Sequence, residues 1–278
     1  MFEIFANIFG FILNIINNIV KNYGLAIILF TILIKVLMLP ISIKQQKTMK
    51  KNAKLQEKIK VLQFKYKNDQ EKLSREMMNL YKEEKMSPFS GCLSAIIQLI
   101  LLLSIFYMVR SPLTYMENIS SDKIDTYVQQ LKENGKSLNT GYKEMDVIRE
   151  IDYLKEVFPE DQDLKNVNIN MNFLGLDLSK VPQQSLTDWT VYIIPILYII
   201  SSFISIRLTN TMQGNMKKAE VIDVTENEEP KEKSEMDLAM EQSNKMMSWM
   251  MPIMSVSISL VAPLGLALYW LVNNILMI

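Results

Sequence analysis

The residue types in this chain leave little room for catalytic chemistry. It has no histidine and one cysteine, Cys92, so the common metal-ligand spacings, an intrachain disulfide and a histidine-assisted nucleophile cannot be assembled. The apolar blocks contain no Asp or Glu. This absence of paired carboxylates argues against an intramembrane aspartyl protease and against a carboxylate-driven proton pump. No phosphate-cradling glycine-rich loop and no GxSxG turn occur. We therefore expect that the protein is not an enzyme and that it has no catalytic residue, no metal site and no cofactor.

What remains is one cation inside an apolar block and a scatter of neutral polar side chains. The cation is Lys35, and the neutral groups are Gln98, Ser104, Ser201, Ser202, Ser205, Asn273 and Asn274. Serines in membrane helices usually bond to their own backbone, so each is a weak signal. The amides of Gln98 and Asn274 need more partners. A lysine in hydrocarbon needs water, or else backbone carbonyls of neighbouring helices.

The elements that position these residues follow from the distribution of apolar residues. Apolar blocks lie near 23–43, 89–109, 189–206 and 246–278, while the segments between them carry nearly all the charge. Several blocks approach the roughly 20 residues that a membrane-spanning helix needs. The last block is too long for one helix and contains Pro263 and Gly265. We therefore predict five spans, at 22–43, 88–109, 189–206, 246–262 and 263–278.

The N-terminal segment 1–21 has a helical pattern of its own. A polar stripe runs along it, and apolar residues such as Phe5, Ile8 and Ile12 cover the rest. This pattern predicts an amphipathic helix lying along the membrane surface, with an additional span as the alternative. The segment lacks the basic leader and small-residue cleavage site of a signal peptide, so we expect it to be retained.

Charge predicts the topology of the spans. Segment 44–87 carries thirteen basic residues against six acids, whereas 110–188 carries nine against fourteen. By the positive-inside rule, 44–87 is cytoplasmic and 110–188 is external. Apolar residues at helical spacing predict a helical hairpin in 44–87, with a solvated spacer as the alternative. Segment 207–245 reads as a cytoplasmic linker. The N-terminus is then outside and the C-terminus cytoplasmic.

The external segment 110–188 is too long for a bare loop. Two short helices are predicted within it, separated by Gly135 and Gly141, followed by an extended amphipathic stretch that returns to the membrane. The fold class expected for the whole chain is an all-α membrane protein. It combines five transmembrane helices, a cytoplasmic helical hairpin and an N-terminal interfacial helix.

Several strings resemble the five-span core of the YidC/Oxa-type insertases. They are GLAIILFTILIKVLMLPISIKQQKTMKK, then MSPFSGCLSAIIQLILLLSIFYMV, and finally MMPIM and PLGLALYWLVNN. The resemblance covers about residues 20–110 and 189–278. It implies a hydrophilic groove, open to the cytoplasm and the lipid, that holds a positive residue of the first span. That position is Lys35 here, where the family usually has Arg, so a bidentate contact with a carboxylate is lost.

The same resemblance places Gln98, Ser205, Trp270 and Asn274 in the groove beside Lys35. Ser205 stands where the family often has Gln, which would make the groove less polar. The function implied is that of a membrane protein insertase or chaperone in the bacterial cell membrane, working without nucleotide hydrolysis. Its partners would be nascent membrane proteins and the lipid bilayer, with no sequence-specific recognition of nucleic acid. Contact with the ribosome and a Sec translocon is left open, and a small transporter or channel with Lys35 in its pore is the alternative.

Overall fold

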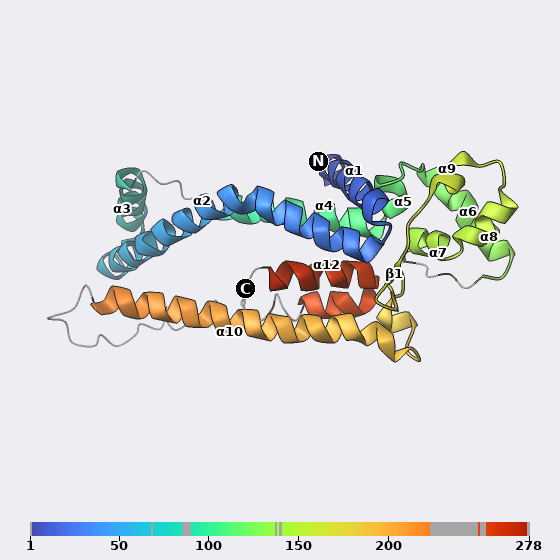
Figure 1. The fold of residues 1–278 in the computed structure, drawn as a ribbon. Coiled ribbons are helices and arrows are strands. Elements are labelled where there is room, and N and C mark those ends of the chain that lie inside the picture. The colour runs from blue at the N-terminus through green and yellow to red at the C-terminus, as the bar shows by residue number, and fades with distance from the viewer. Residues whose placement is uncertain are drawn as a thin grey trace.

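The computed structural model describes residues 2–67, 69–84, 90–136, 138, 141–222, 250 and 254–276. Figure 1 shows an elongated molecule with a helical bundle in its middle. A helical hairpin extends from one end of this bundle, and a group of short helices covers the other, which we name the distal end. Helix accounts for nearly all secondary structure among the described residues. This confirms the prediction of an all-α protein.

The bundle is built from the apolar segments of the chain. Among the described residues, three stretches are long and apolar enough to cross a membrane: Phe2–Val20, Tyr23–Thr48 and Trp189–Leu208. Two shorter apolar stretches, Ile96–Arg110 and Leu264–Ile275, complete the set. The helices are α1 (Phe2–Val20), α2 (Tyr23–Lys65), α4 (Ser90–Arg110), α10 (Ile193–Ile222), a helix over 254–261, and α12 (Leu264–Ile275).

The number of spans stays a prediction. Residues 223–249 and 251–253, which hold most of the predicted linker 207–245 and the start of the span 246–262, lie outside the described residues. The predicted division of the last block is visible, because Pro263 separates the helix over 254–261 from α12. Proline has no amide to donate, so the chain turns there.

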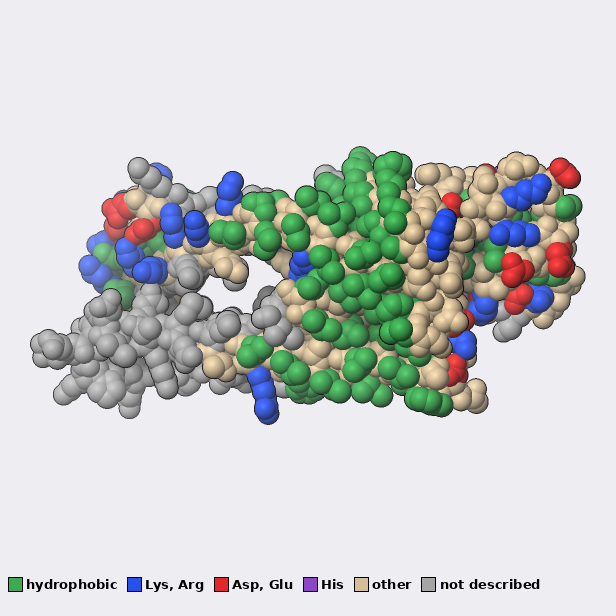
Figure 2. All heavy atoms as spheres, viewed as in Figure 1, with side chains coloured by type: hydrophobic (Ala, Val, Ile, Leu, Met, Phe, Trp, Pro, Cys, Tyr) green, Lys and Arg blue, Asp and Glu red, His purple; other side chains and the backbone are tan. Residues whose placement is uncertain are grey.

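The surface of the bundle is that of a protein surrounded by lipid. Figure 2 shows hydrophobic side chains gathered in a band around the middle, with charged side chains toward both ends. Soluble proteins rarely expose apolar patches this large. Exposed members on two helices are Leu25, Leu29, Leu33, Val36 and Leu37 of α2, and Ile196, Leu197, Ile200, Phe203 and Ile204 of α10.

Helix α2 runs without a break through the predicted boundary at residue 43. The span and the first arm of the hairpin are therefore one helix of 43 residues. Pro40 lies in its interior, and the helix bends midway along its length (Figure 1). The second arm is α3 (Gln70–Glu83), whose first turn is capped by the Asp69 carboxylate. An ion pair between Lys58 and Glu84 joins the two arms.

Helix α1 packs against α2 and α4 through small and apolar residues at helical spacing. Phe9 meets Phe30 of α2 edge-on, with ring centroids 5.8 Å apart. Two asparagines of the polar stripe are turned toward protein: Asn14 donates to the Met116 carbonyl at 2.8 Å, and Asn17, fully buried, donates to that of Asn168 at 3.0 Å. The exposed side chains of α1 are mostly apolar, with Glu3, Asn7 and Asn18 among them. Whether α1 lies along the membrane or crosses it stays a prediction.

The segment predicted to be external folds into short helices with a shared core. The second predicted helix is divided in two at Glu150. Buried Tyr127, Leu131 and Leu154 pack in the core, which is continuous with that of the bundle. The helices are α5 (Pro112–Tyr115), α6 (Ser121–Glu133), α7 (Lys143–Arg149), α8 (Ile151–Val157) and α9 (Gln162–Asn166).

An extended segment, residues 167–181, crosses the distal end of the bundle, and we name it the strap. It contains a small antiparallel hairpin of β1 (Asn172–Phe173) and β2 (Leu176–Asp177). Two short 3-10 turns, η1 (Pro182–Gln184) and η2 (Trp189–Tyr192), then lead into α10. An extended segment here agrees with the sequence analysis.

The strap supplies hydrogen-bond acceptors to the starts of two apolar helices of the bundle, α2 and α12. The Asn170 carbonyl accepts from the first amide of α2, that of Tyr23, at 3.0 Å. At α12, the amides of Leu264 and Gly265 donate to the Lys180 and Leu178 carbonyls, each at 2.9 Å. The first amides of a helix have no acceptor within it, and Pro263 offers α12 no side-chain cap. At α12 the strap therefore takes the place of a cap.

Gly24 allows the strap to approach α2 closely. A Cβ at this position would lie 2.4 Å from Cγ of Phe173, too close for any real contact. Gly265 occupies the same place in α12, yet a Cβ there would lie 3.4 Å from its nearest neighbour, in Tyr23. The two glycines form a matched pair, one crowded and one not.

We expect Gly24→Ala to destabilise the protein by about 1–3 kcal/mol, the usual cost of overpacking. Gly265→Ala should leave stability unchanged or raise it, because alanine favours helix. Thermal unfolding in detergent measures both. Adding Phe173→Ala should recover part of the loss from Gly24→Ala. Equal stability of the two alanine variants would contradict the proposed role of Gly24.

Glu144 of α7 is bonded to α5, which directly follows α4. Its buried carboxylate accepts from the Leu113 amide at 2.6 Å, the Thr114 amide at 3.1 Å and the Thr114 hydroxyl at 2.7 Å. It thereby caps α5. Burial raises the pKa of Glu144, while the hydrogen bonds from Thr114 and Leu113 act in the opposite direction.

Glu144→Ala should cost about 1–3 kcal/mol, because buried amides lose their acceptor. The pKa of Glu144 is raised in the folded state, so the stability gained by protonating it is complete below the ordinary glutamate pKa. It is lost as the pH rises through the raised value. The parent should therefore gain stability relative to Glu144→Gln as the pH falls from neutrality toward the ordinary glutamate pKa of about 4.3. Denaturant titrations measure the free energy of unfolding of both proteins. The same pH dependence for the parent and for Glu144→Gln would contradict a raised pKa of Glu144.

Candidate functional site

Lys35 lies on α2, within the apolar stretch Tyr23–Thr48. It is the only charged residue between positions 23 and 43, eight residues before the end of that range, or about 12 Å along a helix. Its side chain is half-buried and makes no hydrogen bond or ion pair to another described residue. One turn earlier, buried Thr31 donates to the Ile27 carbonyl of its own helix at 2.6 Å.

Gln98 and Ser205 lie on separate helices of the bundle. Gln98 is exposed on α4, and Ser205 is half-buried on α10. Neither side chain bonds to another residue in the described part of the chain. No hydrogen bond joins Gln98 or Ser205 to Lys35 within the described residues, so their grouping around one groove stays a prediction.

The structure does bring Trp270 and Asn274 together with α10. The Asn274 amide nitrogen donates to the Ser201 hydroxyl at 3.1 Å and to the Ser202 hydroxyl at 3.0 Å. One turn away, the rings of Trp270 and Tyr198 lie 6.3 Å apart at 37°. The face of α12 that carries Trp270 and Asn274 is therefore packed and hydrogen-bonded to α10.

Sequence reasoning missed the partners in this cluster. Ser201 and Ser202 are weak signals in the sequence, because membrane serines usually bond to their own helix, and nothing in the sequence singles out Tyr198. Ser201 does donate to the Tyr198 carbonyl at 2.9 Å, but its oxygen also accepts from Asn274. The available signal was the amide of Asn274, which needs several partners inside a membrane helix. This amide indicates that hydrogen-bond partners are required, but it does not identify Ser201 and Ser202 as those partners.

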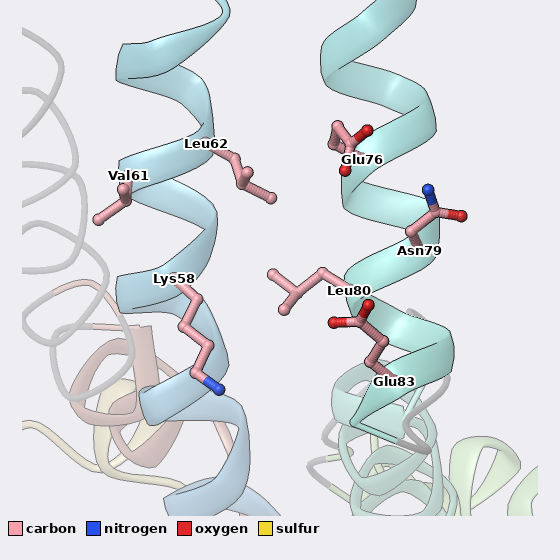
Figure 3. A pocket seen from close by; sticks show the side chains of 7 residues that line it. All are labelled: Lys58, Val61, Leu62, Glu76, Asn79, Leu80 and Glu83. Carbon is pink, nitrogen blue, oxygen red and sulfur yellow. The ribbon is translucent and has the colours of Figure 1, made fainter.

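A pocket of about 310 Å³ lies between the two arms of the hairpin. Figure 3 shows Leu62 and Leu80 pointing into the space between α2 and α3, with the charged Lys58, Glu76 and Glu83 around them. Next to it, Phe64 of α2 is 80% exposed and Met78 of α3 is 52% exposed. The hairpin thus presents apolar side chains within a strongly charged surface.

These arrangements offer binding and positioning more readily than bond chemistry. Within the described residues, no group of three His, Cys, Asp or Glu side chains could hold a metal ion. Lys35 supplies a positive charge within an apolar stretch of α2, and Asn274 supplies hydrogen bonds between α12 and α10. The hairpin supplies an amphipathic surface beyond the apolar band.

Comparison with known proteins matches this chain to one family model. The model described as 60Kd inner membrane protein matches residues 15–278. Two curated relatives are named "Membrane protein insertase YidC", from Francisella tularensis subsp. novicida (strain U112) and subsp. tularensis (strain WY96-3418). Each is 44% identical over 109 residues, which are 39% of this chain and 20% of the relative. The matched stretch thus spans about a fifth of the length of these relatives.

We expect Asn274→Leu to destabilise the protein by about 0.6–2 kcal/mol, the range for hydrogen bonds between membrane helices. Ser201→Ala and Ser202→Ala should each cost less, because the other serine still accepts, whereas the double replacement should match Asn274→Leu. Asn273→Leu is the control, since the Asn273 side chain bonds to no described residue. Unfolding in detergent would contradict the cluster if Asn273→Leu and Asn274→Leu were equally destabilising.

Proposed function

Because the chain belongs to the 60Kd inner membrane protein family, we propose that it assists the insertion of other proteins into the membrane. The names of its family and relatives support an insertase of the bacterial inner membrane, and the apolar band supports a transmembrane protein. The activity resides in a polar groove around Lys35 that is open to the cytoplasm and the lipid. No nucleotide is consumed.

The position of Lys35 is the observation that carries this proposal. A lysine in the centre of a bilayer costs about 2.5–3.5 kcal/mol on insertion scales. Lys35 has no ion-pair partner among the described residues, and no carboxylate lies in the neighbouring apolar stretch. Water in a groove would meet this cost. The same water would shorten the apolar path that a translocating polar segment must cross.

The hairpin is the proposed receiving surface. It shares α2 with Lys35, so a segment bound between the arms would be directed along this helix toward the bundle. Exposed Phe64 and Met78 would contact the apolar part of a substrate, and the surrounding lysines would contact acidic residues. Release follows when the apolar surface of the substrate enters lipid.

The proposed topology and partners follow from the charge distribution and the family. The hairpin and the C-terminus are cytoplasmic, and the short helices at the distal end are external together with the N-terminus. The substrates are nascent membrane proteins, with the ribosome and the Sec translocon as candidate further partners. A channel with Lys35 in its pore would instead leak solutes from sealed vesicles without any protein substrate.

The test is insertion of a single-span substrate with an acidic tail into proteoliposomes. Lys35→Arg should retain insertion, because the positive charge remains. Lys35→Glu should reduce it by about tenfold, the factor that corresponds to 1.4 kcal/mol of lost attraction. Protease protection of the tail measures the inserted fraction at matched protein abundance.

Lys165→Glu is the matched control, since this exposed lysine undergoes the same charge change far from the bundle. It should insert the substrate as the parent does. Equal insertion by Lys35→Glu and the parent would show that Lys35 does not attract the substrate. Leakage of a small solute from vesicles without substrate would favour the channel.

A further inference from the structure

Three large apolar side chains are strongly exposed at the distal end. Leu174 is 87% exposed, Leu186 is 71% exposed and Trp189 is 73% exposed. They belong to the turn of the strap hairpin, the loop after η1 and the first position of η2. Strand β2 packs against η2, so the hairpin and the start of η2 are neighbours. Neither the core of the bundle nor that of the short helices covers these side chains.

The backbone gives no reason for a leucine at position 174. Leu174 has a φ of 51° and Gly175 a φ of 81°, so both central residues of the turn are in the left-handed region. Two-residue hairpin turns of this kind favour Asn, Asp or Gly at the first position. A leucine there is strained and gains no burial within the chain. An environment outside the chain would account for it.

The neighbouring contacts place Leu174 and Trp189 at the boundary where the apolar stretches of two helices begin. Phe173, next to Leu174, fills the space beside Gly24 in the first turn of α2, where the apolar stretch Tyr23–Thr48 begins. Trp189 is the first residue of the apolar stretch Trp189–Leu208. Below it, the exposed apolar side chains of α10 continue the same surface toward the middle of the bundle.

The aqueous side of this boundary is marked by a charged pair. Lys180 Nζ bonds to Asp188 Oδ2 at 2.7 Å, and Asp188 Oδ1 also accepts from the Thr190 amide and hydroxyl. The hydrogen bond from Lys180, followed by those from Thr190, lowers the pKa of Asp188 to about 2. The pair therefore stays ionised at neutral pH, and Lys180 already has its counter-charge.

We propose that Leu174, Leu186 and Trp189 form a lipid anchor that inserts into the boundary between headgroups and acyl chains at the distal end. The anchor continues the lipid-exposed surface of α10, and tryptophan is the residue most suited to this depth. It fastens the strap to the bilayer as well as to the helices. Because Lys180 is paired, the contact depends on apolar surface and not on lipid charge.

The test uses a fluorescent probe on single cysteines in reconstituted protein. Cys92→Ser removes the native thiol, and Leu174→Cys or Leu186→Cys places a nitrobenzoxadiazole label in the anchor. Glu160→Cys is the control, on an exposed position among the short helices. Lipids with a nitroxide at the headgroup should quench both anchor labels several-fold more than the control. Aqueous iodide should quench the control several-fold more than either anchor label.

The result should be the same in phosphatidylcholine vesicles and in vesicles that also contain phosphatidylglycerol. Iodide quenching equal to the control would place the anchor in water. Protection from both quenchers would indicate a protein partner, such as a second copy of the chain. A requirement for phosphatidylglycerol would indicate headgroup charge. Each of these outcomes overturns the proposal, and none depends on insertion activity. Circular dichroism of the labelled proteins confirms that they are folded.

Discussion

The backbone amides at the start of a helix have no acceptor within that helix, and this constraint organises the distal end of the molecule. Near a bilayer such amides cannot rely on bulk water. The strap meets the need at α2 and α12 with its own carbonyls, and Asn22 adds a second tie, since its side chain caps α2 and donates to the Asn172 carbonyl at 2.7 Å. The starts of α2 and α12, which are far apart in sequence, are thereby held beside the same segment.

The ends of other helices in the bundle are also bonded to the short helices and the strap at the distal end. The Tyr142 hydroxyl donates to the Val261 carbonyl at 2.9 Å, and the Arg110 guanidinium lies over the Tyr142 ring while donating to the Gly141 carbonyl. Asn14 and Asn17 of α1 donate to carbonyls beyond α5 and at the strap. The short helices thus form a layer to which several helices of the bundle are attached at one end.

The apolar periodicity of the sequence was enough to predict the helical class, the division at Pro263 and the extended stretch before α10. Those features depend on local composition, which acts over a few residues. The pairing of Asn274 with Ser201 and Ser202 joins residues more than seventy positions apart, and no local pattern encodes it. The same is true of Gly24, whose role depends on Phe173. The family resemblance gave the positions of Lys35, Trp270 and Asn274, but not their contacts.

The continuity of α2 has a mechanical consequence. From Lys35 to Lys65 the helix extends for about 45 Å, so a tilt of about 10° in the membrane would move its far end by about 8 Å. Pro40 removes one backbone hydrogen bond between these points and is the most compliant place in the helix. A rigid α2 would therefore amplify a small rearrangement around Lys35 at the hairpin, and bending at Pro40 would absorb part of that movement.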